Sequence, residues 1–291
     1  MRMALELRGM PVARATVASL EPRVEELKSR GVTPTLAIVR VGAREDDLAY
    51  ERGAKKRCLE AGIAVRIFEL DAECSQQELE DVIARVNEDT GIHGCLMFRP
   101  LPANLDETAV CEALDPAKDV DGITRQSMVG VFANQQVGFP PCTAQAVIDL
   151  LDYYDVELEG ADVCVLGRSL VIGKPVSLML QARNATVTMC HTRTRDLADK
   201  CRAAQVLVVA AGHPKTIGAQ ETDAGQVVVD VGINWDERAQ RLCGDVSYDE
   251  VAQKVSGITP VPGGVGSVTT SVLAKHVVLA AERAARGCGR S

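Results

Sequence analysis

The chain has 291 residues, a formal net charge of −8, and a composition that is 46% hydrophobic but only 3% aromatic. At roughly 100–200 residues per domain this length predicts two domains, and the acidic balance argues against a nucleic acid as partner. No apolar segment is long enough to cross a bilayer and the N-terminus lacks the apolar core of a secretion signal, so we expect no membrane association and a cytoplasmic protein.

The first part of the chain alternates between helix and strand patterns. Apolar residues recur at helical spacing before Gly31, and Ser75 and Glu78 form the pattern of a capping box ahead of another helix. The expected elements are helices at about residues 17–31, 46–62 and 76–86, and strands at 35–42, 64–70 and 94–98. Such alternation predicts a parallel sheet.

A polar stretch at residues 115–138 interrupts this alternation and marks the expected domain boundary. A linking helix at 144–154 leads into a second alternating series. Its strands are expected at 161–167, 185–191, 205–212 and 226–232, and its helices from Gly173 and near 196–204. We therefore expect an α/β fold with two domains, which comprise residues 1–120 with the closing helix 268–291, and residues 140–267.

The turn after the strand at residues 161–167 has the features of a phosphate-binding site. The strand ends in Gly167, and Gly173 and Pro175 begin the next helix. Free amides at a helix N-terminus attract an anion, and glycine lets the backbone approach it. The spacing differs from the standard G-x-G-x-x-G, so an ordinary strand–helix turn is the alternative.

The end of the following strand favours NADP over NAD. NAD-binding folds usually place an acidic residue there to hold the ribose hydroxyls, whereas this strand is followed by Thr192, Arg193 and Arg195. Guanidinium and hydroxyl groups suit a 2′-phosphate, and Arg168 offers a second clamp. The alternative, that these arginines are ordinary solvated surface, applies more to Arg195 than to Arg168.

The ten cysteines and four histidines show no metal-ligand spacing, and the cysteines form no C-x-x-C pair. Several cysteines lie in apolar surroundings, as is typical of buried, reduced thiols in an intracellular protein. We therefore expect reduced thiols and no metal site.

Several motifs occur in a fixed order along nearly the whole chain. They are KDVDG (118–122), PCT (141–143), GRSLVIGKP (167–175), VTMCHTRT (187–194), VVVDVGIN (227–234), GDV (244–246) and TPVPGGVG (259–266). Their order and spacing resemble the bifunctional methylenetetrahydrofolate dehydrogenase–cyclohydrolases. The resemblance implies an N-terminal α/β folate-binding domain, a C-terminal Rossmann-type NADP domain, a cleft between them, and usually a homodimer.

The resemblance also implies an activity and a set of site residues. The family oxidises 5,10-methylenetetrahydrofolate with NADP and hydrolyses the methenyl product to 10-formyltetrahydrofolate; hydride transfer needs two flat rings held face to face without water. By match of motif, Tyr50 stacks on the aminobenzoyl ring and Asp121 holds the pterin, although Asp121 alone would also suit a turn. The remaining implied contacts are Phe98, Pro262, Gly263, Gly264, Val265 and Gly266 for the substrate, and Gly167, Arg168, Ser169, Gly173, Thr192, Arg193, Ile233 and Thr269 for the cofactor.

The chain departs from the family pattern at the cyclohydrolase residues. The family has Tyr-x-x-x-Lys, but the residue four places after Tyr50 is Ala54. At about 100° per residue, Lys55 and Lys56 point away from the face of Tyr50 unless a bulge distorts the helix. Arg57 does lie on the face of Tyr50, but it is ~10 Å further along the helix axis. An arginine is also a poor base.

Phe98 stands where the family has the glutamine that supports this lysine. Smaller departures are Asp47, where serine is usual, and Ser267, where proline is usual. Arg99 alternates to the opposite side of the strand.

The sequence therefore predicts a methylenetetrahydrofolate dehydrogenase with lost or strongly reduced cyclohydrolase activity. Two alternatives stay open: a dehydrogenase for another substrate on the same scaffold, and a non-catalytic protein that binds folate or NADP. An architecture like that of shikimate dehydrogenase also fits two domains, but it does not account for KDVDG or PVPGGVG.

Overall fold

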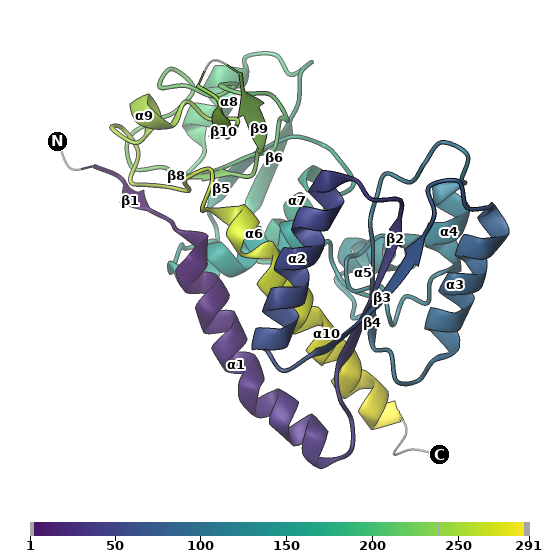
Figure 1. Ribbon diagram of the computed structural model, residues 1–291. Helices are drawn as coiled ribbons and strands as arrows, with labels where there is room; N and C mark the ends of the chain where they lie inside the picture. Colours follow the sequence, from purple (N-terminus) through teal and green to yellow (C-terminus); the bar gives the residue numbers. More distant parts are fainter. Residues whose placement is uncertain (1–2, 238, 288–291) are drawn as a thin grey trace. The chain divides into compact units, whose positions relative to one another are not determined.

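The computed structural model describes residues 3–237 and 239–287, which divide into two compact units (Figure 1). One unit combines the residues up to Ala13 with Thr143–Thr269, and the other combines Arg14–Cys142 with the residues from Thr270 on. The two units match the predicted α/β fold with two domains, and each is built on its own parallel sheet.

The unit that begins at Arg14 contains a three-stranded parallel sheet in the order β3-β2-β4. The strands are β2 (Thr35–Val41), β3 (Ala64–Leu70) and β4 (Gly94–Met97), as predicted. Every residue of the central strand β2 is buried. In Figure 1, α3 (Gln76–Glu88) and α4 (Glu107–Ala113) lie on one side of this sheet, and α2 (Glu45–Glu60) and α10 (Thr269–Gly287) lie on the other.

Local sequence signals explain where these helices begin. The predicted capping box is present at α3, because the Ser75 side chain accepts from the Glu78 amide and the Glu78 carboxylate accepts from the Ser75 amide. The prediction of a loop throughout residues 115–138 was wrong, because α5 (Arg125–Ala133) lies within it. Thr124 caps this helix by accepting from the Ser127 amide.

The other unit contains a six-stranded parallel sheet in the order β1-β11-β8-β7-β5-β6. The chain order reverses at β5, which has β6 on one side and β7 on the other; ligands of doubly wound sheets bind at such a point, beyond the carboxyl ends of the strands. The strands are β1 (Leu5–Glu6), β5 (Asp162–Leu166), β6 (Thr186–Cys190), β7 (Val206–Val209), β8 (Val227–Asp230) and β11 (Gly257–Ile258).

The helices of this unit agree with the predicted Rossmann-type alternation. They are α6 (Cys142–Tyr153, which starts one residue before the unit), α7 (Gly173–Gln181), α8 (Leu197–Ala203) and the short α9 (Tyr248–Val251). A separate hairpin of β9 (Asn234–Asp236) and β10 (Arg241–Cys243) follows β8, and a 3₁₀ turn (Val265–Ser267) precedes α10.

The first residues of the chain are placed differently from the expected boundary. The sequence predicts residues 1–120 in one domain, whereas the residues up to Ala13 group with Thr143–Thr269. The physical reason is that β1 adds a parallel edge strand beside β11, with Leu5 opposite Gly257 and Glu6 opposite Ile258. Helix α1 (Gly9–Ser29) then carries the chain onward from Ala13.

The cysteines agree with the expectation of reduced thiols. The nine described cysteines are all free, and eight of them are buried. Within residues 3–237 and 239–287, no cluster of His, Cys, Asp and Glu is arranged to hold a metal ion. None of the described helices is both long and apolar enough to cross a membrane.

Candidate functional site

The turn between β5 and α7 is held against the sheet by two glycines. Gly167 has φ +134°, and a Cβ there would lie 2.3 Å from the carbonyl oxygen of Ala210. A Cβ on Gly173 would lie 2.3 Å from the carbonyl oxygen of Gly167. Contacts this short are not tolerated, so both positions require glycine for the turn to sit close to the carboxyl edge of the sheet.

The free amides lie in the turn itself, and not at the N-terminus of α7 as the sequence predicts. The Ser169 hydroxyl accepts hydrogen bonds from the amides of Ile172 (3.1 Å) and Gly173 (3.4 Å), so the first amides of α7 are already occupied. The amides of residues 168–171, in contrast, have no acceptor among the residues the structure describes. The amides that are free to bind a ligand therefore belong to the turn itself, while Ser169 caps the helix.

The arginines expected at a 2′-phosphate lie on neighbouring strand ends. Leu166 pairs with Cys190, and the Gly167 amide donates to the Cys190 carbonyl at 2.9 Å, so the residues after β5 and β6 leave the sheet side by side. Arg168 and Arg193 are exposed. Neither Arg168, Arg193 nor Arg195 forms an ion pair within the described part of the chain.

The turn after β6 is shaped by its own side chains. The His191 amide donates to the Thr194 hydroxyl at 2.8 Å, and His191 Nδ1 accepts from the Arg193 amide at 3.1 Å. These bonds fix the backbone around Thr192 and Arg193, whose side chains are exposed. The guanidinium and hydroxyl groups thus lie at the sheet edge on a turn of defined shape.

The glycine-rich segment forms one wall of a cavity of about 230 Å³. Ile233, which is 65% exposed, faces this wall, since a Cβ on Gly266 would lie 3.5 Å from Ile233 Cδ1. The Thr269 hydroxyl donates to the Gly266 carbonyl at 3.1 Å and closes the segment. The cavity is lined by Asp230, Val231, Gly232, Ile233, Leu242 and the residues from Pro260 to Ser267.

Two buried carboxylates that the sequence analysis does not single out hold this wall. Asp230 accepts from the amides of Gly232, Asp245 and Val246, each at 3.0 Å. Asp245 accepts from the amides of Ala211 (2.7 Å) and Gly212 (2.8 Å) and from the Asn234 side chain. Asp230 lies in the VVVDVGIN motif and Asp245 in the GDV motif, so the sequence motifs do include both residues. The motif spacing alone does not show whether such an aspartate holds a loop in place or contacts a ligand.

Tyr50, Phe98 and Asp121, which are expected at the folate, belong to the unit that begins at Arg14. The rings of Tyr50 and Phe98 are in edge-to-face contact, with centroids 6.0 Å apart and planes at 85°. Ala54 has no exposed surface, whereas Lys55 and Lys56 are exposed. Helix α2 is unbroken from Glu45 to Glu60, so no bulge brings either lysine into the position of Ala54.

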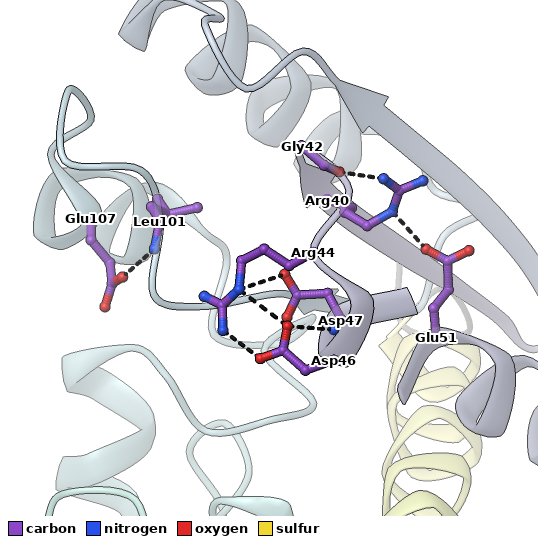
Figure 2. A network of polar contacts seen from close by, with 8 residues as sticks. All are labelled: Arg40, Gly42, Arg44, Asp46, Asp47, Glu51, Leu101 and Glu107. Atoms are coloured by element: carbon purple, nitrogen blue, oxygen red, sulfur yellow. Dashed lines mark hydrogen bonds and ion pairs between the residues drawn. The ribbon is translucent and has the colours of Figure 1, made fainter. Parts of the chain in front are cut away.

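The arginines near this face also have other partners. Arg57 pairs with Glu60 at 2.9 Å, and Arg99 pairs with Glu107 at 3.6 Å. Glu107 also accepts from the Leu101 amide at 2.9 Å (Figure 2). Arg99 is thus tied to the start of α4.

Asp121 lies at the start of α6 and is half-buried. Burial raises the pKa of Asp121 to about 6, and hydrogen bonding with Cys142, whose thiol also lies 3.3 Å from the Val120 carbonyl, offsets this only in part. The carbonyl of the preceding Val120 accepts from His276 Nδ1 on α10 at 2.8 Å. Burial lowers the pKa of His276 to about 4, so it braces this loop as a neutral imidazole.

The KDVDG loop is also held from within by Asp119, which the sequence analysis does not single out. This fully buried carboxylate accepts from the amides of Ile123 (2.9 Å) and Thr124 (2.8 Å) and from the Ser127 hydroxyl (2.6 Å). Of the two acids in the motif, Asp119 shapes the loop and Asp121 presents its carboxylate.

A charged network surrounds the start of α2 (Figure 2). Arg40, on β2, is 5% exposed at its side chain, pairs with Glu51 (3.0 Å) and Glu69 (3.1 Å), and donates to the Gly42 carbonyl. Arg44 pairs with the exposed Asp46 and lies beside the buried Asp47. Through Glu51, the residue that follows Tyr50, this network ties α2 to strand β2.

Comparisons with known proteins agree for both units. The model of the tetrahydrofolate dehydrogenase/cyclohydrolase catalytic domain matches residues 7–121, and that of the NAD(P)-binding domain matches residues 141–285. "Bifunctional protein FolD" of Carboxydothermus hydrogenoformans is 50% identical over 281 residues, covering 96% of this chain and 98% of that protein. The protein of the same name from Clostridioides difficile is 49% identical over 274 residues, covering 94% and 95%.

Solved structures show the same similarity. The bifunctional enzyme FolD of Campylobacter jejuni aligns with a TM-score of 0.93 at 35% identity, covering 96% of this chain and 99% of that chain. The Trypanosoma brucei enzyme, solved with NADP cofactor and inhibitor, aligns with a TM-score of 0.91 at 35% identity, covering 98% and 100%. Shikimate 5-dehydrogenase of Thermus thermophilus aligns with a TM-score of 0.53 at 14% identity over 86% of this chain and 99% of that one, a likeness of fold alone.

Proposed function

Since the chain belongs to the tetrahydrofolate dehydrogenase/cyclohydrolase family, which acts in one-carbon metabolism, we propose that it is an NADP-dependent methylenetetrahydrofolate dehydrogenase whose cyclohydrolase activity is lost or strongly reduced. The observation that carries this proposal is the buried Ala54 on an unbroken α2, with both neighbouring lysines on exposed faces.

The parts that hydride transfer requires are present. We assign folate binding to the unit with Tyr50 and Asp121, and cofactor binding to the turns after β5 and β6. NADP, when bound, supplies the hydride acceptor. The chain's own task is to position the two rings and exclude water, and the wall from Pro262 to Gly266, which has little side-chain bulk, suits that task.

The parts that hydrolysis requires are missing. General acid–base assistance is typically worth about 10²–10⁴-fold, and here an alanine and a phenylalanine stand where the family has its lysine and glutamine. Neither side chain transfers a proton. The proposal is therefore a dehydrogenase that releases the methenyl product.

The direct test follows both products in one reaction. Purified protein is given methylenetetrahydrofolate and NADP, and reduced nicotinamide and methenyl absorbance are recorded together. We expect both to rise one for one, with methenyl then decaying only at the buffer rate. Methenyl that disappears as fast as it forms would refute the loss of cyclohydrolase. Folate binding without turnover would instead favour a non-catalytic protein or another substrate.

Removing the arginines at the 2′-phosphate should weaken NADP binding but not NAD binding. A charge-assisted hydrogen bond is worth about 1.5–3 kcal/mol, so Arg168→Ala and Arg193→Ala should each raise the dissociation constant for NADP by about tenfold or more. Arg195→Ala is the comparison, because ordinary solvated surface fits this exposed arginine better, and it should lose less affinity for NADP than the other two variants. Equal losses for NADP and NAD would show that these residues do not read the 2′-phosphate.

The affinity for folate should depend on pH through Asp121. Its pKa is raised to about 6, and the ionised carboxylate accepts hydrogen bonds on both oxygens, whereas protonation turns one of them into a donor and weakens its hold on the N–H groups of a pterin. Affinity should therefore be level above about pH 6 and fall by up to about tenfold per pH unit below it. Calorimetry with a non-reactive folate analogue measures this. Asp121→Asn should bind weakly with no such step, and a level wild-type profile down to about pH 5 would contradict the role.

Assembly and location follow from the resemblance. We infer a homodimer, and sedimentation equilibrium should give twice the chain mass of 31.1 kDa. A cytoplasmic location is supported by the free thiols of the nine described cysteines. Sedimentation at the mass of a single chain would exclude the dimer.

A further inference from the structure

Helix α2 carries a buried carboxylate on the face of Tyr50 and Ala54. Asp47 precedes Tyr50 by three residues and Ala54 by seven, so the three side chains share one side of the helix. Asp47 is only 8% exposed. Its nearest cationic atom, Arg44 Nε, is 3.8 Å away, which is too far for a hydrogen bond. No other donor reaches this carboxylate among the residues described.

The cations around Asp47 are shared with other carboxylates (Figure 2). Arg44 donates to Asp46 through two nitrogens, and Asp46 also accepts from the Asp47 amide at 3.1 Å. Arg40 is held by Glu51 and Glu69. Arg44 is therefore shared between Asp46 and Asp47, and the charge of Asp47 is compensated only in part.

An ionised carboxylate without hydrogen-bond donors is costly to bury. Burial accordingly raises the pKa of Asp47, and Arg44 offsets this only in part. Such a group gains stabilisation when a ligand brings a positive charge to it. The face therefore favours a cationic ligand over a neutral one of the same shape.

The proposed reaction creates such a cation. In methylenetetrahydrofolate the one-carbon unit bridges two nitrogens. One of its C–H bonds breaks, and hydrogen leaves with both electrons for the nicotinamide ring, which thereby loses its own positive charge. The remaining carbon shares one positive charge with the two nitrogens, and no proton is exchanged.

We propose that Asp47 is the counter-charge for this methenyl cation, an inference that rests on the proposed dehydrogenase function. Helical side chains lean toward the N-terminus, so a lysine at position 54 would extend over the turn that begins at Asp47. Because Ala54 replaces the family's lysine and Asp47 replaces its serine, this side of α2 carries a carboxylate where the family has an ammonium group. It disfavours the base chemistry of hydrolysis and selects the charged product.

The test compares a cationic with a neutral ligand. Calorimetry measures the dissociation constants of methenyltetrahydrofolate and tetrahydrofolate for the wild type, Asp47→Asn and Asp47→Ser. A single charge in a partly buried site is worth on the order of tenfold in binding. We therefore expect both variants to lose about tenfold for the methenyl ligand and less than about twofold for tetrahydrofolate.

Glu45→Gln is the matched control, because it removes a negative charge from the first turn of the same helix at an exposed side chain that forms no ion pair with Arg44. It should leave the ratio of the two dissociation constants unchanged, and melting temperatures of all variants check folding. Equal losses for both ligands in the Asp47 variants, or no loss, would overturn the counter-charge. A wild type that binds neither ligand would instead refute the proposed function.

Discussion

Ala54→Lys combined with Phe98→Gln is expected to raise methenyl hydrolysis by about 10²–10⁴-fold, the usual worth of general acid–base assistance. The lysine alone should give much less, because Ala54 is fully buried and the Phe98 ring contacts Tyr50 one turn away on the same face. Glutamine at position 98 removes that ring and supplies a polar partner. The two substitutions should therefore be strongly non-additive, as measured by the decay of methenyl absorbance above the buffer rate.

Two controls separate chemistry from packing in this experiment. Ala54→Met with Phe98→Gln supplies similar length without a charge and should not restore hydrolysis. Lys55→Ala alters an exposed lysine on another face and should have no effect. A double variant that folds and keeps its dehydrogenase activity, yet hydrolyses no faster than the wild type, would show that more than these two residues separates this chain from a cyclohydrolase.

Gly173→Ala should abolish useful NADP binding, raising the dissociation constant by at least about 100-fold, and lower stability by about 3 kcal/mol. The added Cβ would meet backbone atoms of Gly167 and Arg168 at 2.3–2.7 Å, and backbone cannot rotate away as a side chain can. Helix α7 must then move from the turn that carries the free amides. Energy transfer from Trp235, the single tryptophan and 55% exposed, to reduced cofactor reports binding without turnover.

Gly160→Ala is the comparison for that variant. Gly160 has φ +72° and open surroundings, so alanine there costs only about 1 kcal/mol of backbone strain. It should bind NADP like the wild type. If Gly173→Ala binds equally well, the close approach of α7 to the turn is not what shapes the cofactor site.

The sequence predicted the elements that are long and strongly patterned. The buried run of β2 and the capping box of α3 are decisive local signals, and both are present. It did not predict β1, β11 or the β9–β10 hairpin, because strands of two or three residues are too short to show a period. It also missed α5, a helix of nine residues that is flanked by polar segments.

The candidate site was predictable as far as motifs name residues. Motifs do not show which acid in KDVDG turns inward, and the structure assigns that place to Asp119. Nor do they show that Ser169 bonds the amides of its own helix. Asp47 looked like a minor departure, since only three-dimensional packing shows that its carboxylate is buried without a hydrogen-bond donor. Burial and bonding geometry are the quantities that one sequence leaves out.

The edge strand β1 matters for expressing the cofactor-binding unit by itself, because β1 comes from the other end of the chain. A fragment that contains only Thr143–Thr269 would lack β1, one of the two neighbours of β11, and would leave one edge of β11 with unpaired backbone donors and acceptors. Open edges recruit other chains. The cofactor-binding unit is built from two separate segments of the chain. A recombinant version of this unit therefore needs the N-terminal segment joined to Thr143–Thr269, so that β1 can pair with β11.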